Sequence, residues 1–123
     1  MGAPDPREAE VVIGVGMGLK RRENVAYAVE LAKLLGGAVA ATGNVVHAGW
    51  HPYHVQVDVS GKAVAPRLYS ALGIKGDVNH LVGIRRAKHI AAVKINKCAD
   101  IFRSANLGVV GNAVKISQHL IEL

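Results

Sequence analysis

The stretch "LYSALGIKGDVNHLVGI" (residues 68–84) changes its pattern at Gly73. The residues before Gly73 form a short apolar run that is typical of a buried strand, whereas those from Asp77 onward have the character of a helix. Gly73, Lys75 and Gly76 lie between the two segments, where the chain must turn. A buried strand, a glycine-rich turn and a helix in this order are typical of proteins built around a parallel sheet.

The rest of the chain repeats this succession on both sides of residues 68–84. Strands are expected at residues 10–15, 38–41, 67–74, 89–95 and 107–112, and helices at residues 21–35, 77–87 and 113–123. Residues 44–62 are irregular and predict a long binding loop with at most a short strand at residues 54–59. The order predicts a three-layer α/β/α fold with a mainly parallel, doubly wound, Rossmann-like sheet.

Length and composition indicate one folded domain. The chain has 123 residues, of which 50% are hydrophobic, and we expect a single domain over residues 9–123 behind a flexible leader at residues 1–8. No apolar run is long enough to span a bilayer, and the first ten residues lack the features of a secretory signal, so a soluble cytoplasmic protein is expected. Cys98 is the only cysteine, which excludes an intrachain disulfide and predicts a small buried or half-buried side chain.

The charge favours an anionic ligand or an acidic partner. The formal net charge is +6. Nucleic acid is not expected, because aromatic residues make up only 4% of the chain and no nucleic-acid-binding motif is present.

His47, His51 and His54 are close enough in sequence for zinc, but the sequence places no fourth ligand, so no metal is expected. The basic cluster at residues 20–22 is interpreted as a solvated helix start.

Glycines follow three of the expected strands at the same end. They are Gly16 and Gly18 after the first strand, Gly43 after the second, and Gly73 and Gly76 after the third. Ligands of parallel sheets bind at the carboxyl ends of the strands, where main-chain amides and the following helix attract phosphate. The turn at residues 73–76 is therefore a candidate phosphate site, with the Lys75 ammonium beside it. A turn that needs glycine only for its backbone conformation is the alternative.

Three stretches of the chain, at residues 16–42, 48–84 and 92–112, resemble the carboxyl-terminal FAD-binding domain of the electron transfer flavoprotein α subunit. They include "GMGLKRRENV", "SGKAVAPRLYSALGIKGDVNHLVGI" and "NLGVVGN". The resemblance implies that FAD binds noncovalently across the carboxyl edge of the sheet and relays electrons between dehydrogenases and an acceptor. It also implies redox partner proteins, and a β-like subunit or a second copy that completes the site.

The glycine pattern and the resemblance together nominate a set of cofactor-binding residues. In the resemblance, Ser60 offers a hydroxyl to the central flavin ring and His80 donates a hydrogen bond to a ring carbonyl. Asn106 and Asn112 occupy positions that are usually aspartate, toward the adenosine end. The full set is Gly16, Gly18, Thr42, Gln56, Ser60, Gly61, Lys75, Gly76, Asn79, His80, Asn96, Asn106 and Asn112.

The chain departs from the family pattern at positions that contact the flavin. Met17 and Gly43 stand at arginine positions, and Val59 replaces a glutamine. Loss of an arginine beside reduced flavin is expected to lower the reduction potential or weaken binding, and Lys75 is expected to compensate in part by pairing with the diphosphate. The family's amino-terminal α-subunit domain also has no counterpart in this sequence. The alternative function is a module of the same fold that has lost the redox part of its site and binds AMP or ADP, or that serves only in assembly.

Overall fold

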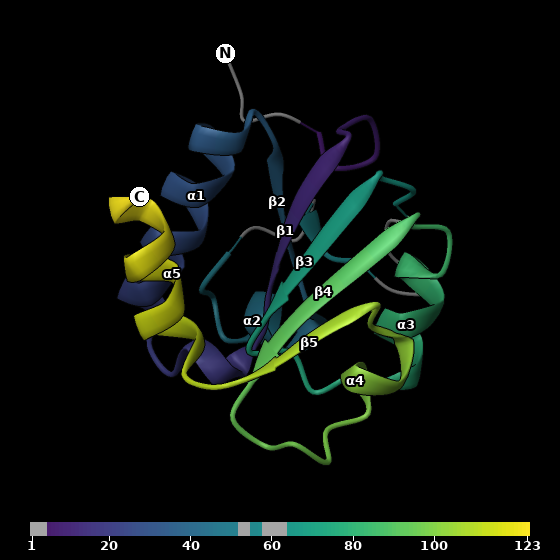
Figure 1. The fold of residues 1–123 in the computed structure, drawn as a ribbon. Helices are drawn as coiled ribbons and strands as arrows, with labels where there is room; N and C mark the ends of the chain where they lie inside the picture. Colours follow the sequence, from purple (N-terminus) through teal and green to yellow (C-terminus); the bar gives the residue numbers. More distant parts are fainter. Residues whose placement is uncertain (1–4, 52–54, 58–63) are drawn as a thin grey trace.

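A sheet of five parallel strands forms the centre of the protein (Figure 1). The structure is a computed structural model, which describes residues 5–51, 55–57 and 64–123. The strands are β1 (Val11–Val15), β2 (Ala38–Ala41), β3 (Leu68–Leu72), β4 (His89–Lys94) and β5 (Leu107–Val110), in the order β2-β1-β3-β4-β5. The apolar run at residues 68–72 is thus the central strand, paired with β1 on one side and β4 on the other.

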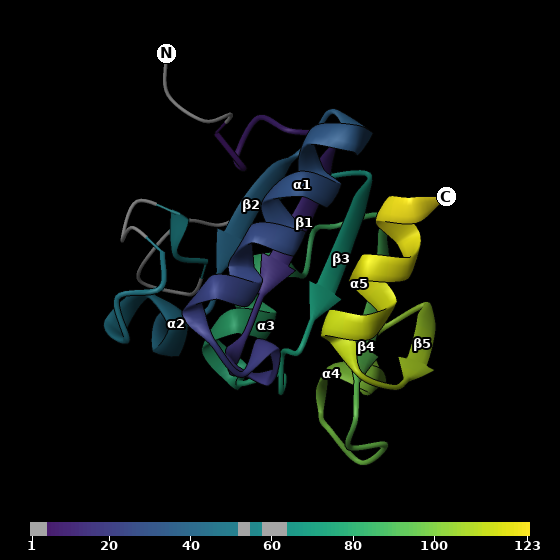
Figure 2. The ribbon, with the colours of Figure 1, turned by 90° about the vertical axis from the view of Figure 1, so that its left-hand side faces the viewer.

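Helices cover both faces of this sheet, which confirms the expected three-layer α/β/α, doubly wound fold. On one face lie α1 (Val25–Leu35) and α5 (Ala113–Glu122), which pack against each other, and on the other lie α3 (Val78–Ile84) and α4 (Ile101–Ser104) (Figures 1 and 2). A short helix α2 (Gly43–His47) follows β2, and two 3-10 turns, η1 (Met17–Leu19) and η2 (Arg22–Asn24), precede α1.

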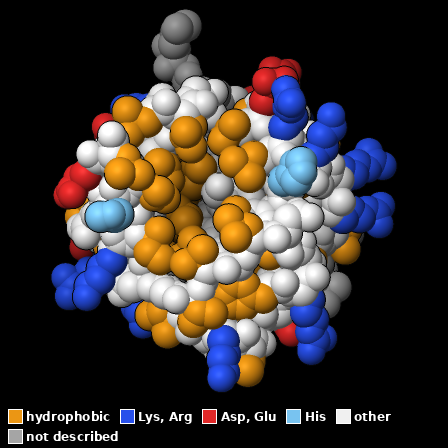
Figure 3. Space-filling view, in the orientation of Figure 1, with side chains coloured by type: hydrophobic (Ala, Val, Ile, Leu, Met, Phe, Trp, Pro, Cys, Tyr) orange, Lys and Arg blue, Asp and Glu red, His pale blue; other side chains and the backbone are white. Residues whose placement is uncertain are grey.

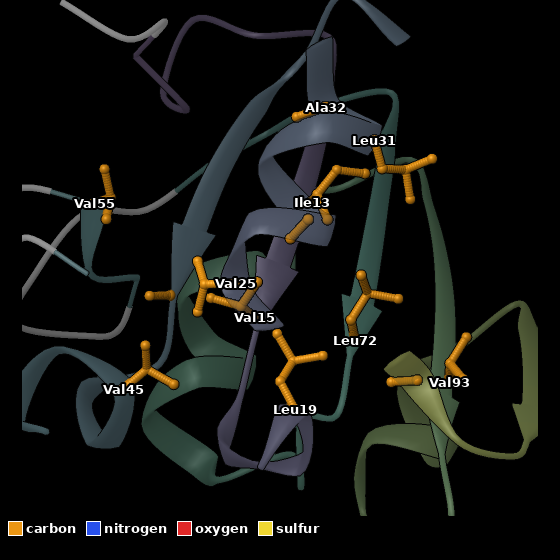
Figure 4. Close-up of a cluster of buried hydrophobic side chains, with 13 residues drawn as sticks. Ile13, Val15, Leu19, Val25, Leu31, Ala32, Val45, Val55, Leu72 and Val93 are labelled. Carbon is orange, nitrogen blue, oxygen red and sulfur yellow. The ribbon is translucent and has the colours of Figure 1, made fainter. Parts of the chain in front are cut away.

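Alternating side chains of β1 supply the two halves of the core. Ile13 and Val15 point to the face of α1 and α5 and join the cluster shown in Figure 4, whereas Val12 points to the face of α3 and α4. All three side chains are fully buried. Burial of each such aliphatic side chain contributes about 1.5–3 kcal/mol to folding, so the two faces hold the sheet between their helices.

Two short helices and a helix start differ from the prediction. The first helix begins at Val25 rather than at residue 21, because the chain first makes two 3-10 turns in which the Asn24 side-chain amide donates to the Leu19 carbonyl (2.8 Å). Helix α2 lies in the segment expected to be a loop, and α4 was not expected. Both have at most five residues, which is too short to produce a helical period in the sequence. Within the expected strand at residues 54–59, Gln56 makes one parallel bridge with Ala41, and residues 54, 58 and 59 lie outside the described residues.

The carboxyl-terminal strand lies at an exposed edge. Leu107 and Val110 of β5 are 61% and 60% exposed, and Figure 3 shows hydrophobic side chains gathered around a hollow on this side of the molecule.

The expectation that Cys98 is buried or half-buried was wrong. Its side chain is exposed, because it lies in the loop after β4, where its backbone N–H donates to the Asn96 side chain (2.9 Å). In the part of the chain that the structure describes, no helix is long and apolar enough to cross a membrane.

Candidate functional site

The connectivity of the sheet opens a crevice between β1 and β3. The chain leaves β1 through α1 toward β2 and leaves β3 through α3 toward β4, so the two crossovers run on opposite faces and in opposite directions. A cavity of about 500 Å³ lies at this point, and a second cavity of about 230 Å³ adjoins it, with Gly73 and Lys94 lining both. The first is within the usual size range of small-molecule sites.

The turns after β1 and β3 pack backbone against backbone at this crevice. The N–H of Gly18 donates to the Gly73 carbonyl (2.9 Å), and the N–H of Gly16 donates to the Leu72 carbonyl (3.0 Å). A Cβ on Gly18 would lie 2.5 Å from the Gly73 Cα, which leaves no space for a side chain. Gly73 also has a φ of 67° and donates its own N–H to the Val93 carbonyl. These glycines therefore join two turns, and their amides are not available to a phosphate.

Positive charge at the crevice comes instead from lysine side chains. Lys75 and Lys94 line the first cavity, and Lys20 and Lys94 line the second. Partial burial lowers the pKa of Lys94 from its ordinary value, and the neighbouring ammonium groups of Lys20 and Lys75 add to this lowering. Among the described residues, none of the three forms an ion pair with a carboxylate. Lys20 has a φ of 75°, a conformation that is costly for a residue with a side chain and is often found at binding sites.

The structure brings most of the sequence candidates to the two cavities. The first cavity is lined by Gly16, Thr42, Gln56, Lys75, Gly76, Asn79 and His80, and the second by Gly18 and Asn96. Asn112 caps the amino end of α5, where its side chain accepts a hydrogen bond from the Lys115 N–H (3.0 Å). Its neighbours in sequence, Gly111 and Ala113, both line the second cavity. Ser60, Gly61 and Val59 lie outside the described residues.

Asn106 lies apart from the others. It precedes β5, and its side chain accepts a hydrogen bond from the Ile90 N–H (2.8 Å) near the start of β4. Because both strands begin there, Asn106 lies at the amino edge of the sheet, opposite the two cavities. Asn106 lines neither of the two cavities, and its role toward adenosine stays a prediction.

Comparison with known proteins decides the family. Residues 6–85 match a family model described as the electron transfer flavoprotein FAD-binding domain. The chain belongs to the electron transfer flavoprotein α family. It is 44% identical over 119 residues to the mitochondrial electron transfer flavoprotein subunit alpha of Arabidopsis thaliana, covering 97% of this chain and 33% of that protein. The resemblance stated from the sequence is confirmed.

Two bacterial proteins are also similar to this chain over most of its length. The chain is 40% identical over 119 residues to the subunit alpha of Mycobacterium leprae, covering 97% of this chain and 37% of that protein. It is 41% identical over 114 residues to Protein FixB of Azotobacter vinelandii, covering 93% of this chain and 32% of that protein. The chain thus spans about a third of the length of the relatives it matches.

Two departures from the pattern of the electron transfer flavoprotein α family lie at the first cavity. Met17 lines it and is 44% exposed. A Cβ on Gly43 would lie 3.2 Å from the Gln56 side-chain nitrogen, so the side chain of Gln56 occupies the space that a longer residue at position 43 would enter. Neither position supplies a cation, and the lysines described above are the positive groups of the site.

Sequence reasoning missed Lys20 and Lys94 as site residues. Lys20 was assigned to a solvated helix start, but the helix begins later and Lys20 lies in the turn after β1. Lys94 was only included in the strand expected at residues 89–95. The available signal was a charged residue near the carboxyl end of an otherwise apolar run, because ligands bind at that edge of a parallel sheet.

His80 lies in the first cavity as expected, but both of its ring nitrogens contact protein groups. The ring is 3% exposed, with Nε2 2.7 Å from the Tyr69 hydroxyl and Nδ1 3.0 Å from the Val57 carbonyl oxygen. Burial raises the pKa of Tyr69 well above its ordinary value, so its hydroxyl keeps its proton at neutral pH.

Proposed function

We propose that this electron transfer flavoprotein α-family chain binds FAD noncovalently at the crevice between β1 and β3 and takes part in electron transfer between dehydrogenases and an acceptor. The main support is the pair of adjoining cavities, which share Gly73 and Lys94 and carry three lysines that have no carboxylate partner among the described residues. An elongated ligand with a central diphosphate matches this arrangement of two spaces with positive charge between them.

The residues of the two cavities would hold different parts of FAD. Lys20, Lys75 and Lys94 would bind the diphosphate, and the larger cavity with Gln56 and His80 would receive the flavin. The smaller cavity, with Asn96 and the neighbouring Asn112, would receive the adenosine. Thr42, Gly76 and Asn79 line the larger cavity and would contact the flavin. Ser60 and Gly61 are included on the family resemblance alone. The redox chemistry belongs to the flavin, and the protein contributes binding, orientation and the local field.

An adenine-nucleotide module is the second candidate function. It is favoured by the absence of a cation at Met17 and Gly43 on the flavin side, while the lysines near the second cavity remain. Such a module would bind AMP or ADP through the lysines and the asparagines, and the larger cavity would have lost its redox role.

A titration with three ligands separates these functions. FAD added to the purified chain is expected to bind at one site, with a change in flavin absorbance and quenched fluorescence, and ADP is expected to compete more weakly than FAD binds. Binding of ADP or AMP without binding of FAD would establish the nucleotide module instead. Absence of binding by all three at low salt would contradict both functions.

We further propose that the chain works in an assembly, in the cytoplasm, with redox partner proteins. Relatives are named as subunits, and a β-like subunit or a second copy would complete the flavin site. Sedimentation velocity over a range of concentrations is expected to show self-association, or a monomer that becomes larger only when a β-like subunit is added. A monomer that binds FAD fully and is unaffected by such a subunit would contradict the proposal.

A further inference from the structure

The turn after β1 holds Lys20 in a conformation that a lysine rarely adopts. Its φ of 75° and ψ of −40°, with a hydrogen bond from the Arg21 N–H to the Leu19 carbonyl (2.9 Å), form a γ-turn of the rare and strained type. Every other positive φ among the described residues belongs to a glycine, at Gly36, Gly49, Gly73 and Gly76. A turn that needed only this backbone path would be best served by glycine at position 20 as well. The lysine therefore points to a use for its side chain.

Three contacts keep the turn in this conformation. The Asn24 side-chain amide donates to the same Leu19 carbonyl (2.8 Å), so this oxygen accepts two hydrogen bonds from the turn. The Leu19 side chain is fully buried, and the Lys20 N–H donates to the Met17 carbonyl (2.9 Å). A strained residue persists only where its surroundings determine its conformation. Of these contacts, the one from Asn24 can be removed by a substitution that changes neither the core nor the main chain.

The conformation of Lys20 directs its side chain to the ligand site. Lys20 lines the second cavity together with Lys94, although the two residues belong to different parts of the sheet edge. Their ammonium groups are close enough to interact, since Lys20 contributes, after partial burial of Lys94 itself, to the lowered pKa of Lys94. A change of φ from positive to negative would move the Cβ of Lys20 to the other side of the local backbone and turn its side chain away from Lys94.

We propose that Asn24 is a positioning residue, which holds Lys20 in the strained turn so that the Lys20 ammonium meets the diphosphate of a nucleotide at the second cavity. The choice of ligand rests on the proposed function, whereas the hold of Asn24 on Lys20 is a property of the chain itself. Asn24 lines neither cavity, so its effect on a ligand passes through Lys20. The turn thus gives up some backbone stability and gains a fixed cation.

Binding of ADP to the purified chain tests the proposal, because ADP carries the diphosphate without the flavin. Lys20→Gly removes the ammonium and suits the backbone, whereas Asn24→Ala removes the hydrogen bond and keeps the ammonium. Each variant is expected to weaken ADP binding about fivefold, the effect of one ammonium–phosphate contact. The double variant is expected to show the same loss, because Asn24 acts only through Lys20. A loss of about 25-fold in the double variant, or wild-type affinity in either single variant, would overturn the proposal.

The stability of Lys20→Gly separates a binding role of the lysine from a structural one. Glycine adopts a positive φ without strain, so the denaturation midpoint of this variant is expected to equal or exceed that of the wild type. A lower midpoint would show that the lysine stabilises the fold itself and would overturn the proposal. Because Lys20→Gly keeps the turn, its midpoint and its ADP affinity decide the question even if Asn24→Ala does not fold.

Gln118→Ala is the matched control for Asn24→Ala. The Gln118 side-chain amide donates to the Tyr27 hydroxyl in a partly buried hydrogen bond of the same length, 2.8 Å, between α5 and α1. Gln118 lines neither cavity. Its replacement removes one amide hydrogen bond and is expected to leave ADP affinity unchanged. An equal loss of affinity in this control would attribute the effect of Asn24→Ala to general loosening of the fold and would overturn the proposal.

A measurement without ligand follows the position of Lys20 directly. The Lys94 ammonium can be titrated by NMR, and the pKa of Lys94 is expected to rise toward its ordinary value in Lys20→Gly, which removes a neighbouring positive charge. Asn24→Ala is expected to raise this pKa as well, because the released Lys20 moves away, and Gln118→Ala is expected to leave it unchanged. Failure of ADP and FAD to bind would contradict the proposed function and leave this measurement intact. A Lys94 pKa that rises in Lys20→Gly but not in Asn24→Ala would overturn the positioning role of Asn24.

Discussion

Gly73→Ala is expected to lower the free energy of unfolding by about 2–5 kcal/mol. The residue has a φ of 67°, which costs an alanine about 1–2 kcal/mol. The new Cβ would also lie 2.7 Å from the backbone carbon of Gly18, so the turns after β1 and β3 would have to separate at an overpacking cost of about 1–3 kcal/mol. Chemical denaturation measures the loss, and FAD or ADP binding is expected to weaken with it, because Gly73 lines both cavities.

Gly49→Ala is the control for the backbone contribution. Gly49 has a similar φ of 77°, but no atom of the described residues lies within 4 Å of the position of its Cβ. Its replacement should therefore cost only the backbone part, about 1–2 kcal/mol, and should leave ligand binding unchanged. Equal losses for the two variants would mean that the close approach of Gly18 and Gly73 contributes nothing to the requirement for glycine.

Simultaneous replacement of Lys20, Lys75 and Lys94 by alanine is expected to weaken binding of FAD about 100-fold, at about 1 kcal/mol for each ammonium–phosphate contact. These side chains are the positive groups at the junction of the two cavities, whereas the amides of Gly16, Gly18 and Gly73 donate to protein carbonyls. The affinity of the wild type should also fall as salt is raised, and that of the variant should fall less. Fluorescence titration at two salt concentrations measures both effects.

A second triple variant is the control for net charge. It removes three positive charges at the amino edge of the sheet, away from the two cavities. Lys33, Arg67 and Lys88 are exposed and lie at the end of α1 and just before β3 and β4, at the amino edge of the sheet. Their replacement by alanine lowers the net charge by the same amount. Affinity is expected to change by less than about threefold, which is the size of a screened, long-range effect. Similar losses in the two triple variants would show that overall charge, and not a local phosphate site, governs binding.

Much of the fold could be predicted from the sequence, because the spacing of apolar residues differs between the main strands and the main helices. The run at residues 68–72 and the segment from residue 78 follow two different periods, and the structure turns between them at residues 73–77. Prediction failed where an element was too short to show a period, as for α2 and α4. It also failed for Cys98, since its exposure depends on the path of the loop after β4 and not on the residue type.

The candidate site could be predicted in position but not in mechanism. The glycines after β1 and β3 pointed to the correct edge of the sheet, yet their amides are used in contacts between the two turns. Sequence shows which groups are present, whereas hydrogen-bond partners depend on segments brought together by folding. The same reason explains why Tyr69 was not noticed, since its hydroxyl meets a histidine 11 positions away across the sheet–helix boundary.

The crevice between β1 and β3 exists because neighbouring strands send their crossovers in opposite directions. No single side chain creates the crevice. Its position would therefore stay the same even if every residue that lines it were replaced. Substitutions such as Met17 and Gly43 at the expected arginine positions therefore change the chemistry of the crevice and leave its position in the sheet unchanged. In this chain, the path of the backbone therefore sets the place of the crevice, and the side chains around it set which molecule it accepts.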